Sequence, residues 1–355
     1  MAKQLIKGNE AIAEAAIVAG CRHYFGYPIT PQSQIPEYMA KRLPQVGGCF
    51  LQAESEISAI NMVYGAAGAG VRSMTSSSSP GISLKQEGIS YIATAQLPCL
   101  IVNIVRGGPG LGSISPSQGD YFQATKGGGH GDYHMFVFAP SSVQEAADMV
   151  MEGFDIADIY RIPVMILGDG MIGQMMEPVE FGDYKPRALP DKQWAATGWT
   201  DKTRPRAVIN SLFIEDELLE ATQLELLAKY EEIKKNETRW EEYNCEGAEV
   251  IIAAYGTVAR IVKNVIAMGA KDGIKIGLVR PKTVWPFPYD AYRKAAEQSS
   301  VKFLLDVEMS AGQMLEDVRL AVGDIKPVHY FGRLGGFVPT PKEIYEQIIK
   351  IKEGK

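Results

Sequence analysis

The sequence has no cysteines at the spacing of a metal or cluster ligand set. Its four cysteines, Cys21, Cys49, Cys99 and Cys245, are widely separated, and neither CxxC nor CxxxC occurs among the 355 residues. Zinc sites and iron–sulfur clusters are commonly built from such local pairs. We therefore expect four reduced thiols, mostly buried, and no metal held by this chain. If the protein takes part in electron transfer, the clusters lie on another chain.

An excess of positive charge and a long apolar run are also missing. The 36 lysines and arginines are outnumbered by 42 aspartates and glutamates, which gives a formal net charge of −6. A nucleic-acid-binding face would require a basic excess. No run approaches the roughly 18 apolar residues of a membrane span, and Glu10 and Glu14 interrupt the first apolar stretch, unlike a signal peptide. We expect a cytoplasmic protein with neither nucleic acid nor a membrane as a partner.

What the sequence does contain is a repeated alternation of short apolar runs with helical patterns. It extends over residues 1–173, where the run 99–105 is apolar on both faces, as in the middle of a parallel sheet. It resumes over 247–355. Between them, 174–246 is rich in proline and charge, and 215–243 predicts a long charged helix. We predict two α/β domains with mainly parallel sheets, 1–173 and 247–355, joined by a linker.

The expected elements follow from this alternation. Strands are expected at 23–26, 49–52, 71–75, 99–105, 135–138, 163–167, 249–255, 274–279, 302–307 and 327–332. Helices are expected at 9–19, 32–42, 56–68, 82–95, 142–160, 257–268, 289–297, 311–321 and 341–352. A long glycine-rich loop is expected at 107–133, and loops of this length inside a domain are usually functional.

Three polar stretches each follow an expected strand. They are 27–31 (Tyr-Pro-Ile-Thr-Pro), 54–56 (Glu-Ser-Glu) and 106–109 (Arg-Gly-Gly-Pro). In an open α/β sheet the carboxyl ends of the strands face one crevice, where ligands bind. A hydroxyl, a carboxylate and a guanidinium would therefore meet there. This set suits a small substrate that carries its own carboxylate, beside a cofactor nitrogen that must be protonated.

These stretches, together with the helix that starts at Glu56, resemble the α-subunit of 2-oxoacid:ferredoxin oxidoreductases, which use thiamine diphosphate. The resemblance covers nearly the whole chain. The runs 75–81 (Thr-Ser-Ser-Ser-Ser-Pro-Gly) and 126–132 (Lys-Gly-Gly-Gly-His-Gly-Asp) bring it nearest to the branched-chain, 2-oxoisovalerate type. It implies a thiamine pyrimidine-binding domain followed by a transketolase C-terminal-like domain. The implied reaction is the coenzyme A-dependent oxidative decarboxylation of a 2-oxoacid to acyl-CoA and CO2, with reduction of ferredoxin.

The resemblance also implies roles for individual residues. Glu56 matches the family's catalytic glutamate, which hydrogen-bonds the aminopyrimidine ring of the cofactor, and Thr30 and Arg106 complete the catalytic set. The implied cofactor-binding residues are Glu56, Tyr27, Pro28 and Ile29, and the implied substrate-binding residues are Thr30, Arg106, Gly107 and Gly108.

Each of these residues also has an alternative role. Glu54 competes with Glu56 as the functional carboxylate, since both lie at the start of the same helix. Thr30, followed by a proline, could simply cap the next helix. Arg106 could form a structural ion pair, because a guanidinium at the end of so apolar a strand is costly unless paired. Its possible partners are Asp120, Asp132 and Glu56. In the long loop, His130 and Asp132 could relay protons or merely order the backbone.

The sequence Gly168-Asp169-Gly170 is an incomplete diphosphate and magnesium motif. Thiamine enzymes pair this sequence with an asparagine roughly 25–30 residues later, which adds an oxygen ligand for a hard cation. Residues 190–200 contain no asparagine, and the first one downstream is Asn210. We infer that this chain holds the pyrimidine half of thiamine diphosphate. A diphosphate-binding β-subunit, a γ-subunit and a ferredoxin-like subunit are the implied partners and would carry Mg2+ and the iron–sulfur clusters.

Three other functions compete with this prediction. A 2-oxoglutarate-specific α-subunit would need a further basic group for the second carboxylate, and Lys126 is the one candidate in the sequence. A non-catalytic interaction subunit would keep the fold without the chemistry, but all three polar residues are present. A stand-alone binding protein for small carboxylates would bind 2-oxoacids without thiamine.

Overall fold

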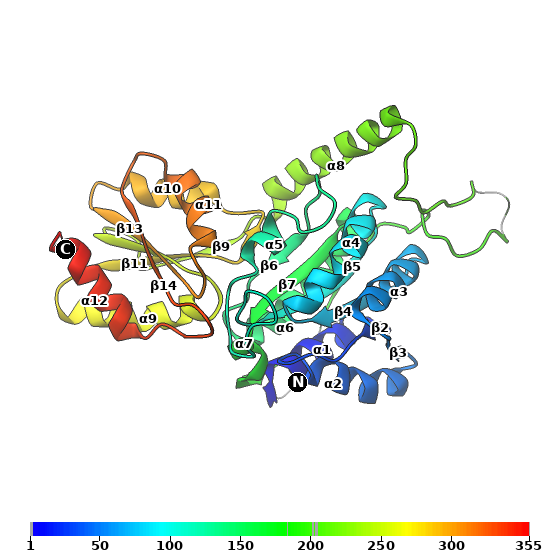
Figure 1. The fold of residues 1–355 in the computed structure, drawn as a ribbon, viewed down its shortest axis with the longest axis horizontal. Coiled ribbons are helices and arrows are strands. Elements are labelled where there is room, and N and C mark those ends of the chain that lie inside the picture. Colours follow the sequence, from blue (N-terminus) through cyan, green and yellow to red (C-terminus); the bar gives the residue numbers. More distant parts are fainter. Residues whose placement is uncertain (1–2, 183, 201, 203–204, 355) are drawn as a thin grey trace.

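The chain folds into two α/β lobes that lie side by side, with one long helix along the outside (Figure 1). The computed structural model describes residues 3–182, 184–200, 202 and 205–354. Within that part of the chain, no helix combines the length and the apolar character that crossing a bilayer requires.

The first lobe is built on a seven-stranded sheet in the order β12-β6-β7-β5-β4-β2-β3. All pairs are parallel except β12 with β6. Every residue of the central strand β5 is buried, as its apolar sequence predicts. The strands are β2 (His23–Gly26), β3 (Cys49–Gln52), β4 (Ser73–Ser77), β5 (Cys99–Val105), β6 (Phe136–Phe138), β7 (Pro163–Asp169) and β12 (Thr283–Trp285).

Helices cover this sheet in two groups. Helix α1 packs on α2 and α6, and α3 packs on α4. The pairing of α3 with α4 matters for the site, because both helices begin at the carboxyl edge of the sheet. The elements are α1 (Gly8–Val18), α2 (Gln34–Arg42), the 3-10 turn η1 (Leu43–Val46), α3 (Glu56–Gly68), α4 (Pro80–Thr94), α5 (Tyr121–Thr125), α6 (Val143–Tyr160) and α7 (Gly170–Gln174).

The second lobe is a five-stranded sheet in the order β14-β13-β10-β11-β9, parallel except for β9 at one edge. Its strands are β9 (Trp240–Tyr243), β10 (Val250–Ala253), β11 (Ile276–Pro281), β13 (Phe303–Glu308) and β14 (Val328–Gly332). Its helices are α9 (Gly256–Lys271), α10 (Tyr289–Glu297), α11 (Gln313–Val322) and α12 (Pro341–Lys352). The predicted fold class, α/β with mainly parallel sheets, is therefore confirmed.

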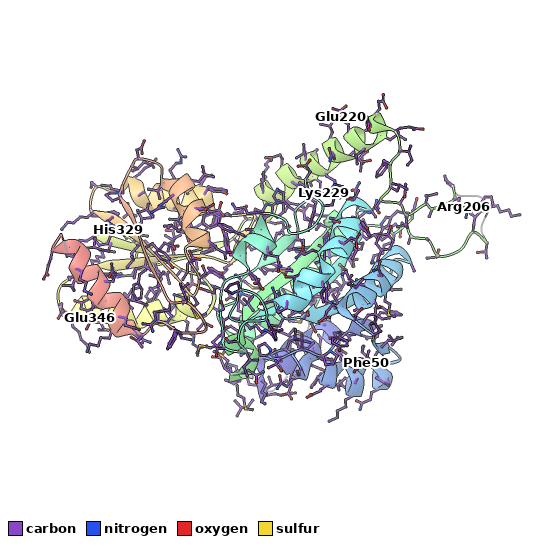
Figure 2. The ribbon with its side chains drawn as sticks, viewed as in Figure 1. Phe50, Arg206, Glu220, Lys229, His329 and Glu346 are labelled. Carbon is purple, nitrogen blue, oxygen red and sulfur yellow. The ribbon has the colours of Figure 1, made fainter. Side chains whose placement is uncertain are left out.

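The long charged helix is real but shorter than the sequence predicts. Helix α8 (Asp216–Glu237) ends where Thr238 turns the backbone extended, and the remaining predicted residues form β9. The prediction of helix up to residue 243 is thus wrong, because pairing with β11 outweighs the helical charge pattern. In the segment before α8, Arg187 and Lys192 still pair with Glu152 and Asp158 of the first lobe. The later stretch, which carries Arg206, extends away from that lobe as an arm (Figure 2).

Short edge strands are the elements that the sequence does not reveal. Strands β1 (Gln4–Lys7) and β8 (Met176–Val179) form a separate antiparallel pair. Strand β8 contains a proline, a residue that argues against a strand because it is found in sheets mainly at edges. The sequence therefore does not predict this strand. Strand β12 comes from the second half of the chain but joins the first sheet, and β9 lies inside the predicted linker. We propose the division into 1–173, 174–246 and 247–355. It assigns β9 and β12 by their place in the sequence and not by the sheet that each strand joins.

Buried polar contacts join the lobes. The side chain of Gln118 donates to the Tyr255 carbonyl at 3.0 Å and accepts from the Met309 N–H at 2.9 Å. The Tyr121 hydroxyl donates to Asp317 at 2.6 Å. The glycine-rich loop predicted at 107–133 therefore carries the contact between the lobes and includes the short helix α5.

An ion pair between Glu145 of α6 and Arg280 of β11 is a second interlobe contact. The guanidinium donates two bonds to the carboxylate, at 2.7 and 2.8 Å, and its side chain is 3% exposed. Burial alone would raise the pKa of Glu145, but bonds from Arg280 outweigh it and hold the pKa at about 2, below the ordinary 4.5.

We expect Glu145→Gln to lower the free energy of unfolding by about 2–4 kcal/mol, because Arg280 keeps its buried charge and loses one of its carboxylates. A carboxyl group whose pKa is lower in the folded than in the unfolded protein stabilises the fold at pH values above its unfolded-state pKa. The difference between wild type and variant should therefore shrink as the pH falls from about 4.5 toward 2. Urea denaturation across this pH range measures it.

Glu87→Gln is the matched control, because Glu87 is exposed and, among the described residues, its carboxylate accepts a hydrogen bond from Tyr91 on its own helix alone. Its effect should stay within about 0.5 kcal/mol. Equal losses of unfolding free energy in the two variants would show that the Glu145–Arg280 pair stabilises the fold no more than an exposed glutamate does.

Candidate functional site

The three predicted stretches do meet at one edge of the first sheet. Strands β5, β4, β2 and β3 are consecutive neighbours, so the segments that leave their carboxyl ends lie side by side. These segments are 27–31 after β2, 53–56 after β3, 78–81 after β4 and 106–110 after β5. The topology therefore brings Thr30, Glu56 and Arg106 to the same edge, as expected from strand order in an open sheet.

Glu56 is the first residue of α3, and it is only 6% exposed. Ser55 caps the helix by accepting the Ser58 N–H at 3.3 Å. Its competitor Glu54 is exposed and accepts a bond from the Ser58 hydroxyl at 3.2 Å. Of the two carboxylates, Glu56 is thus the one removed from water.

Gly81 in the first turn of α4 lies against the Glu56 carboxylate. A Cβ placed on Gly81 would come within 2.5 Å of Glu56 Oε1 and 2.0 Å of Ser77 Oγ. The Ser77 hydroxyl is buried and has no hydrogen-bond partner among the described residues. A buried hydroxyl without a partner beside a buried carboxylate is typical of a site that awaits a polar ligand.

Lys85, one turn further along α4, is fully buried beside Glu56, and the sequence motifs do not single it out. Its Nζ donates to the Glu56 carbonyl at 3.3 Å. Burial lowers the pKa of Lys85 to about 8, and the charge of Glu56 opposes this shift. The available sequence signal is helical spacing, since Lys85 lies in register with Ile82 and Ile89 on the buried face.

Arg106 is 7% exposed, and its guanidinium bonds only main-chain oxygens among the described residues. Its Nη1 donates to the Thr30 carbonyl and its Nη2 to the Leu111 carbonyl, both at 2.9 Å, while Nε has no partner. Asp120, a possible ion-pair partner from the sequence, instead accepts a bond from Asn103 at 2.8 Å. The structural ion pair considered for Arg106 is therefore absent from the described residues, and its charge is buried without a counter-ion.

The loop 27–31 lies open beside this guanidinium. Thr30, Tyr27 and Pro28 are exposed and Ile29 is half-buried. The loop is held from behind, because Asn9 and Gln174 both donate to the Pro31 carbonyl, at 2.8 and 2.7 Å. Ser33 occupies the N-cap position of α2, so Thr30 is not its N-cap, and that alternative is wrong.

Ser79 links the loops after β4 and β5. Its N–H donates to Asn103 at 3.1 Å, and its Oγ accepts the Arg106 N–H at 3.1 Å. Its φ of 28° is in the left-handed region, which is strained for a residue other than glycine. Directly after Arg106, Gly107 is buried and Gly108 is exposed. The backbone around Arg106 is thus fixed from both sides.

Asp169 of the incomplete motif is already fully used by the fold. It caps α7 by accepting from the Met171 and Ile172 N–H groups, at 2.9 and 3.2 Å, and it accepts the Thr257 hydroxyl of the second lobe at 2.8 Å. Burial raises its pKa. An aspartate engaged in this way is a poor ligand for a cation, which agrees with the missing asparagine.

The remaining candidates lie apart from this edge. His130 and Asp132 are both exposed on the glycine-rich loop. Lys126 donates to Asp317 at 2.6 Å, so its charge is already paired.

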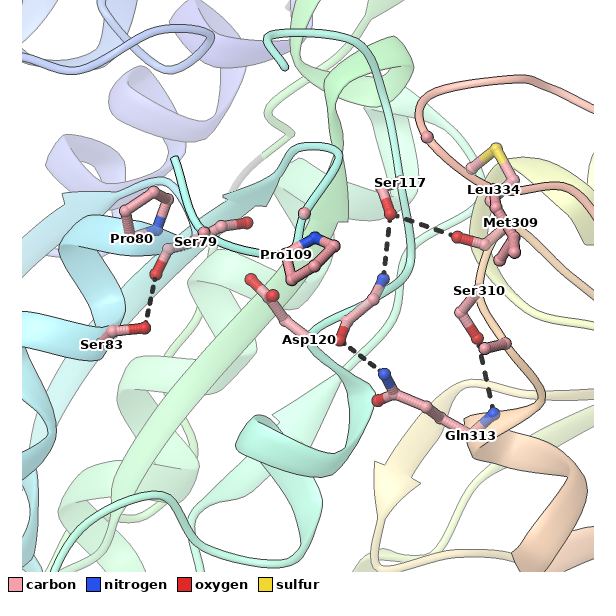
Figure 3. Close-up of a pocket in the computed structure, with 15 residues that line it drawn as sticks. Ser79, Pro80, Ser83, Pro109, Ser117, Asp120, Met309, Ser310, Gln313 and Leu334 are labelled. Atoms are coloured by element: carbon pink, nitrogen blue, oxygen red, sulfur yellow. Dashed lines mark hydrogen bonds between the residues drawn. The ribbon is translucent and has the colours of Figure 1, made fainter. Parts of the chain in front are cut away.

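A cavity of about 420 Å3 lies between the lobes, behind the loops that follow β4 and β5 (Figure 3). Ser79, Gly108 and Asp120 face it from the first lobe, and Met309 and Gln313 from the second. Burial raises the pKa of Asp120. Glu56, Thr30 and Arg106 do not line this cavity, but Gly108, an implied substrate-binding residue, does, so the cavity borders the candidate site.

Known families and proteins match the chain over nearly its whole length. Residues 14–237 match the family described as pyruvate flavodoxin/ferredoxin oxidoreductase, thiamine diphosphate-binding, and residues 248–344 match pyruvate:ferredoxin oxidoreductase core domain II. The ketoisovalerate oxidoreductase subunit VorB of Methanothermobacter thermautotrophicus is 47% identical over 99% of this chain and 98% of its own length. The 2-oxoglutarate synthase subunit KorA of the same organism is 36% identical over 98% of both chains.

The fold has a solved counterpart. A 2-oxoglutarate:ferredoxin oxidoreductase from Magnetococcus marinus, with 2-oxoglutarate, coenzyme A and succinyl-CoA bound, superposes with a TM-score of 0.87 at 27% identity. The match covers 98% of this chain but spans only 65% of that longer chain.

These matches define the class as an oxidoreductase subunit with a thiamine diphosphate-binding domain followed by a second α/β domain. The chain belongs to the 2-oxoacid:ferredoxin oxidoreductase family, so the resemblance in the sequence is confirmed.

We expect Gly81→Ala to lower turnover of the assembled enzyme about 10²-fold, because the new methyl group must displace the Glu56 carboxylate or the Ser77 hydroxyl. Gly65→Ala on α3 is the control, since a Cβ there meets no atom within 4 Å. Steady-state assays and thermal unfolding compare the two. Full activity in Gly81→Ala would show that the position of this carboxylate is not critical.

Proposed function

We propose that this chain supplies the acid–base and substrate-binding half of a thiamine diphosphate site in a ketoisovalerate:ferredoxin oxidoreductase. The reaction would convert a branched 2-oxoacid and coenzyme A into acyl-CoA and CO2, with electrons passing to ferredoxin. The relatives named as ketoisovalerate oxidoreductase subunits support this substrate. A cytoplasmic location stays a prediction.

The observation that carries the proposal is the burial of two opposite charges, Arg106 and Glu56, at one edge of the sheet, where the guanidinium has no counter-ion among the described residues. Arg106 has no carboxylate partner among the described residues, and a buried charge of this kind is costly without an anion. A 2-oxoacid is an anion of suitable size. The free Nε and the second hydrogens of Nη1 and Nη2 offer donors to its carboxylate.

The residues around Glu56 fit the pyrimidine half of thiamine diphosphate. When bound, the cofactor supplies a carbon nucleophile that attacks the carbonyl of the 2-oxoacid. Glu56 would hold a proton at the ring nitrogen it faces, in a pocket that Gly81 keeps free of side-chain atoms. Tyr27, Pro28 and Ile29 would form the wall next to this ring. Thr30 and Arg106 would orient the substrate, with Gly107 and Gly108 allowing close approach of the backbone.

The diphosphate and its Mg2+ would be held by a β-subunit. The engagement of Asp169 in helix capping and interlobe contact supports this division. A γ-subunit and a ferredoxin-like subunit would complete the complex, and iron–sulfur clusters would lie on these partners.

A 2-oxoglutarate-specific enzyme is the second candidate, supported by the relatives named 2-oxoglutarate synthase. Its substrate carries a second carboxylate, for which Lys126 is the basic group that the sequence offers. Because Lys126 is paired with Asp317 at 2.6 Å, it is less available for that role. The assembled complex should therefore oxidise 2-oxoisovalerate in preference to 2-oxoglutarate, as tested with a low-potential dye.

We expect Glu56→Gln to reduce turnover by about 10²-fold or more while leaving the fold intact, because an amide accepts a hydrogen bond but cannot share its proton. Glu54→Gln is the matched control and should leave turnover within about twofold, since Glu54 is exposed. If Glu54→Gln is the inactive variant and Glu56→Gln is active, the catalytic carboxylate has been assigned wrongly.

We expect Arg106→Lys to lower kcat/KM about 30- to 1,000-fold, since an ammonium cannot reproduce the planar fork. Thr30→Ala keeps the main-chain carbonyl that Arg106 bonds and removes only the hydroxyl, so its effect should be about fivefold, or about 1 kcal/mol. Steady-state kinetics with thiamine titration separates the two. Unchanged kcat/KM with a weakened fold in Arg106→Lys would assign Arg106 a purely structural role.

A further inference from the structure

A fully buried lysine beside the candidate acid–base glutamate has no role in the function described so far. Lys85 has zero exposure, and the one acceptor for its Nζ among the described residues is the Glu56 carbonyl at 3.3 Å. A lysine can donate three hydrogen bonds. Burying an ammonium with a single main-chain acceptor is unfavourable, so a purely structural reason for Lys85 is weak.

Lys85 bonds Glu56 through its carbonyl, and the same helix carries the residue that lies against the Glu56 carboxylate. Lys85 lies one turn after Gly81, which packs against the Glu56 carboxylate, so both ends of Glu56 face the same side of α4. Helices α3 and α4 pack together at this point, with Gly88 leaving room for Ile60. Among the described groups, Glu56 is the one whose charge acts on Lys85.

We propose that Lys85 is a positioning residue that fixes the start of α3 and holds Glu56 in its ionised form when a proton has passed to the bound ring. This inference rests on the proposed function, because it assigns Glu56 the acid–base role. The ammonium that bonds the Glu56 carbonyl places a positive charge at the backbone of the same residue, and such a charge favours the carboxylate over the carboxylic acid where water is excluded. Proton donation by Glu56 therefore becomes easier while Lys85 is charged.

This role has a signature in the pH dependence of turnover. Since burial lowers the pKa of Lys85 to about 8, the ammonium loses its proton just above neutral pH. The kcat of the wild-type complex should therefore decline above about pH 8. Lys85→Met should lower kcat about 10- to 100-fold at pH 7, which is the size of effect seen when a residue that orients a functional side chain is removed. The kcat of this variant should not decline at alkaline pH.

The matched control is Lys229→Met. Lys229 lies on α8, on the outer side of the first lobe (Figure 2), and bonds Gln96 and the Arg161 carbonyl. Burial lowers its pKa to about 8 as well, so it is a lysine of the same kind away from Glu56. Lys229→Met should keep the wild-type kcat and its alkaline decline. Lys85→Arg should recover part of the lost kcat, since it restores the charge.

A measurement without turnover separates this inference from the proposed function. In thermal unfolding of the full chain, Lys85→Met should cost less in a Glu56→Gln background than in wild type, by about 2 °C or more, because the two charges stabilise each other. If the wild-type complex oxidises no 2-oxoacid, the proposed function fails, and this double-mutant cycle still tests the coupling. Additive losses overturn the proposal.

Two kinetic outcomes would also overturn it. A raised KM for the 2-oxoacid with unchanged kcat would mean that Lys85 binds the substrate carboxylate. Wild-type kinetics with the alkaline decline retained in Lys85→Met would mean that Lys85 only supports packing.

Discussion

The cost of burying charge at the carboxyl edge of a parallel sheet determines how this site is built. Strand β5 is buried along its whole length and apolar except at Asn103. It nevertheless leads directly into Arg106, and α3 begins with Glu56 buried. Each charge must be solvated by something other than water. For Arg106 the structure uses two main-chain carbonyls, one on either side, and the ammonium of Lys85 bonds the main-chain carbonyl of Glu56. The carbonyls solvate the guanidinium of Arg106 without neutralising it, which leaves a place for an anion.

The same constraint explains why the neighbouring backbone is so restricted. Ser79 is strained because it must offer its N–H to Asn103 and its hydroxyl to the Arg106 N–H at once. Gly81 must lack a side chain because the Glu56 carboxylate occupies that space. Strain and a missing side chain both cost stability, and they are tolerated where a rigid framework surrounds them. Here that framework is the stack of buried strands and the polar contacts from the second lobe.

Much of the fold follows from local pattern. Buried strands such as β5 and the helices between them are recognised from apolar runs and helical spacing, because each can be identified without its partners. Strand β9 cannot, since its charged sequence favours helix until pairing with β11 is formed. Strand β12 joins a sheet more than a hundred residues away, which no local pattern encodes. Tertiary pairing outweighs local propensity at both places.

The features of the site also divide into those that the sequence predicts and those that only tertiary packing creates. The convergence of Thr30, Glu56 and Arg106 follows from strand ends, and the burial of Glu56 relative to Glu54 follows only from packing on α4. Lys85 has no motif because its significance lies in what surrounds it. A lysine in a helix is ordinarily solvated, and only the contact between α3 and α4 removes its water.

Asp169 shows how the fold can use a carboxylate that a diphosphate motif would leave free for a cation. An aspartate in a Gly-Asp-Gly turn could bind a cation if its oxygens were free. Here one carboxylate accepts from two helix N–H groups and from Thr257 of the second lobe. Removing these bonds to bind a metal would leave buried donors without an acceptor and remove one of the contacts between the lobes. The interlobe contact therefore competes with a metal site at this position, which supports the proposal that a partner subunit holds the diphosphate.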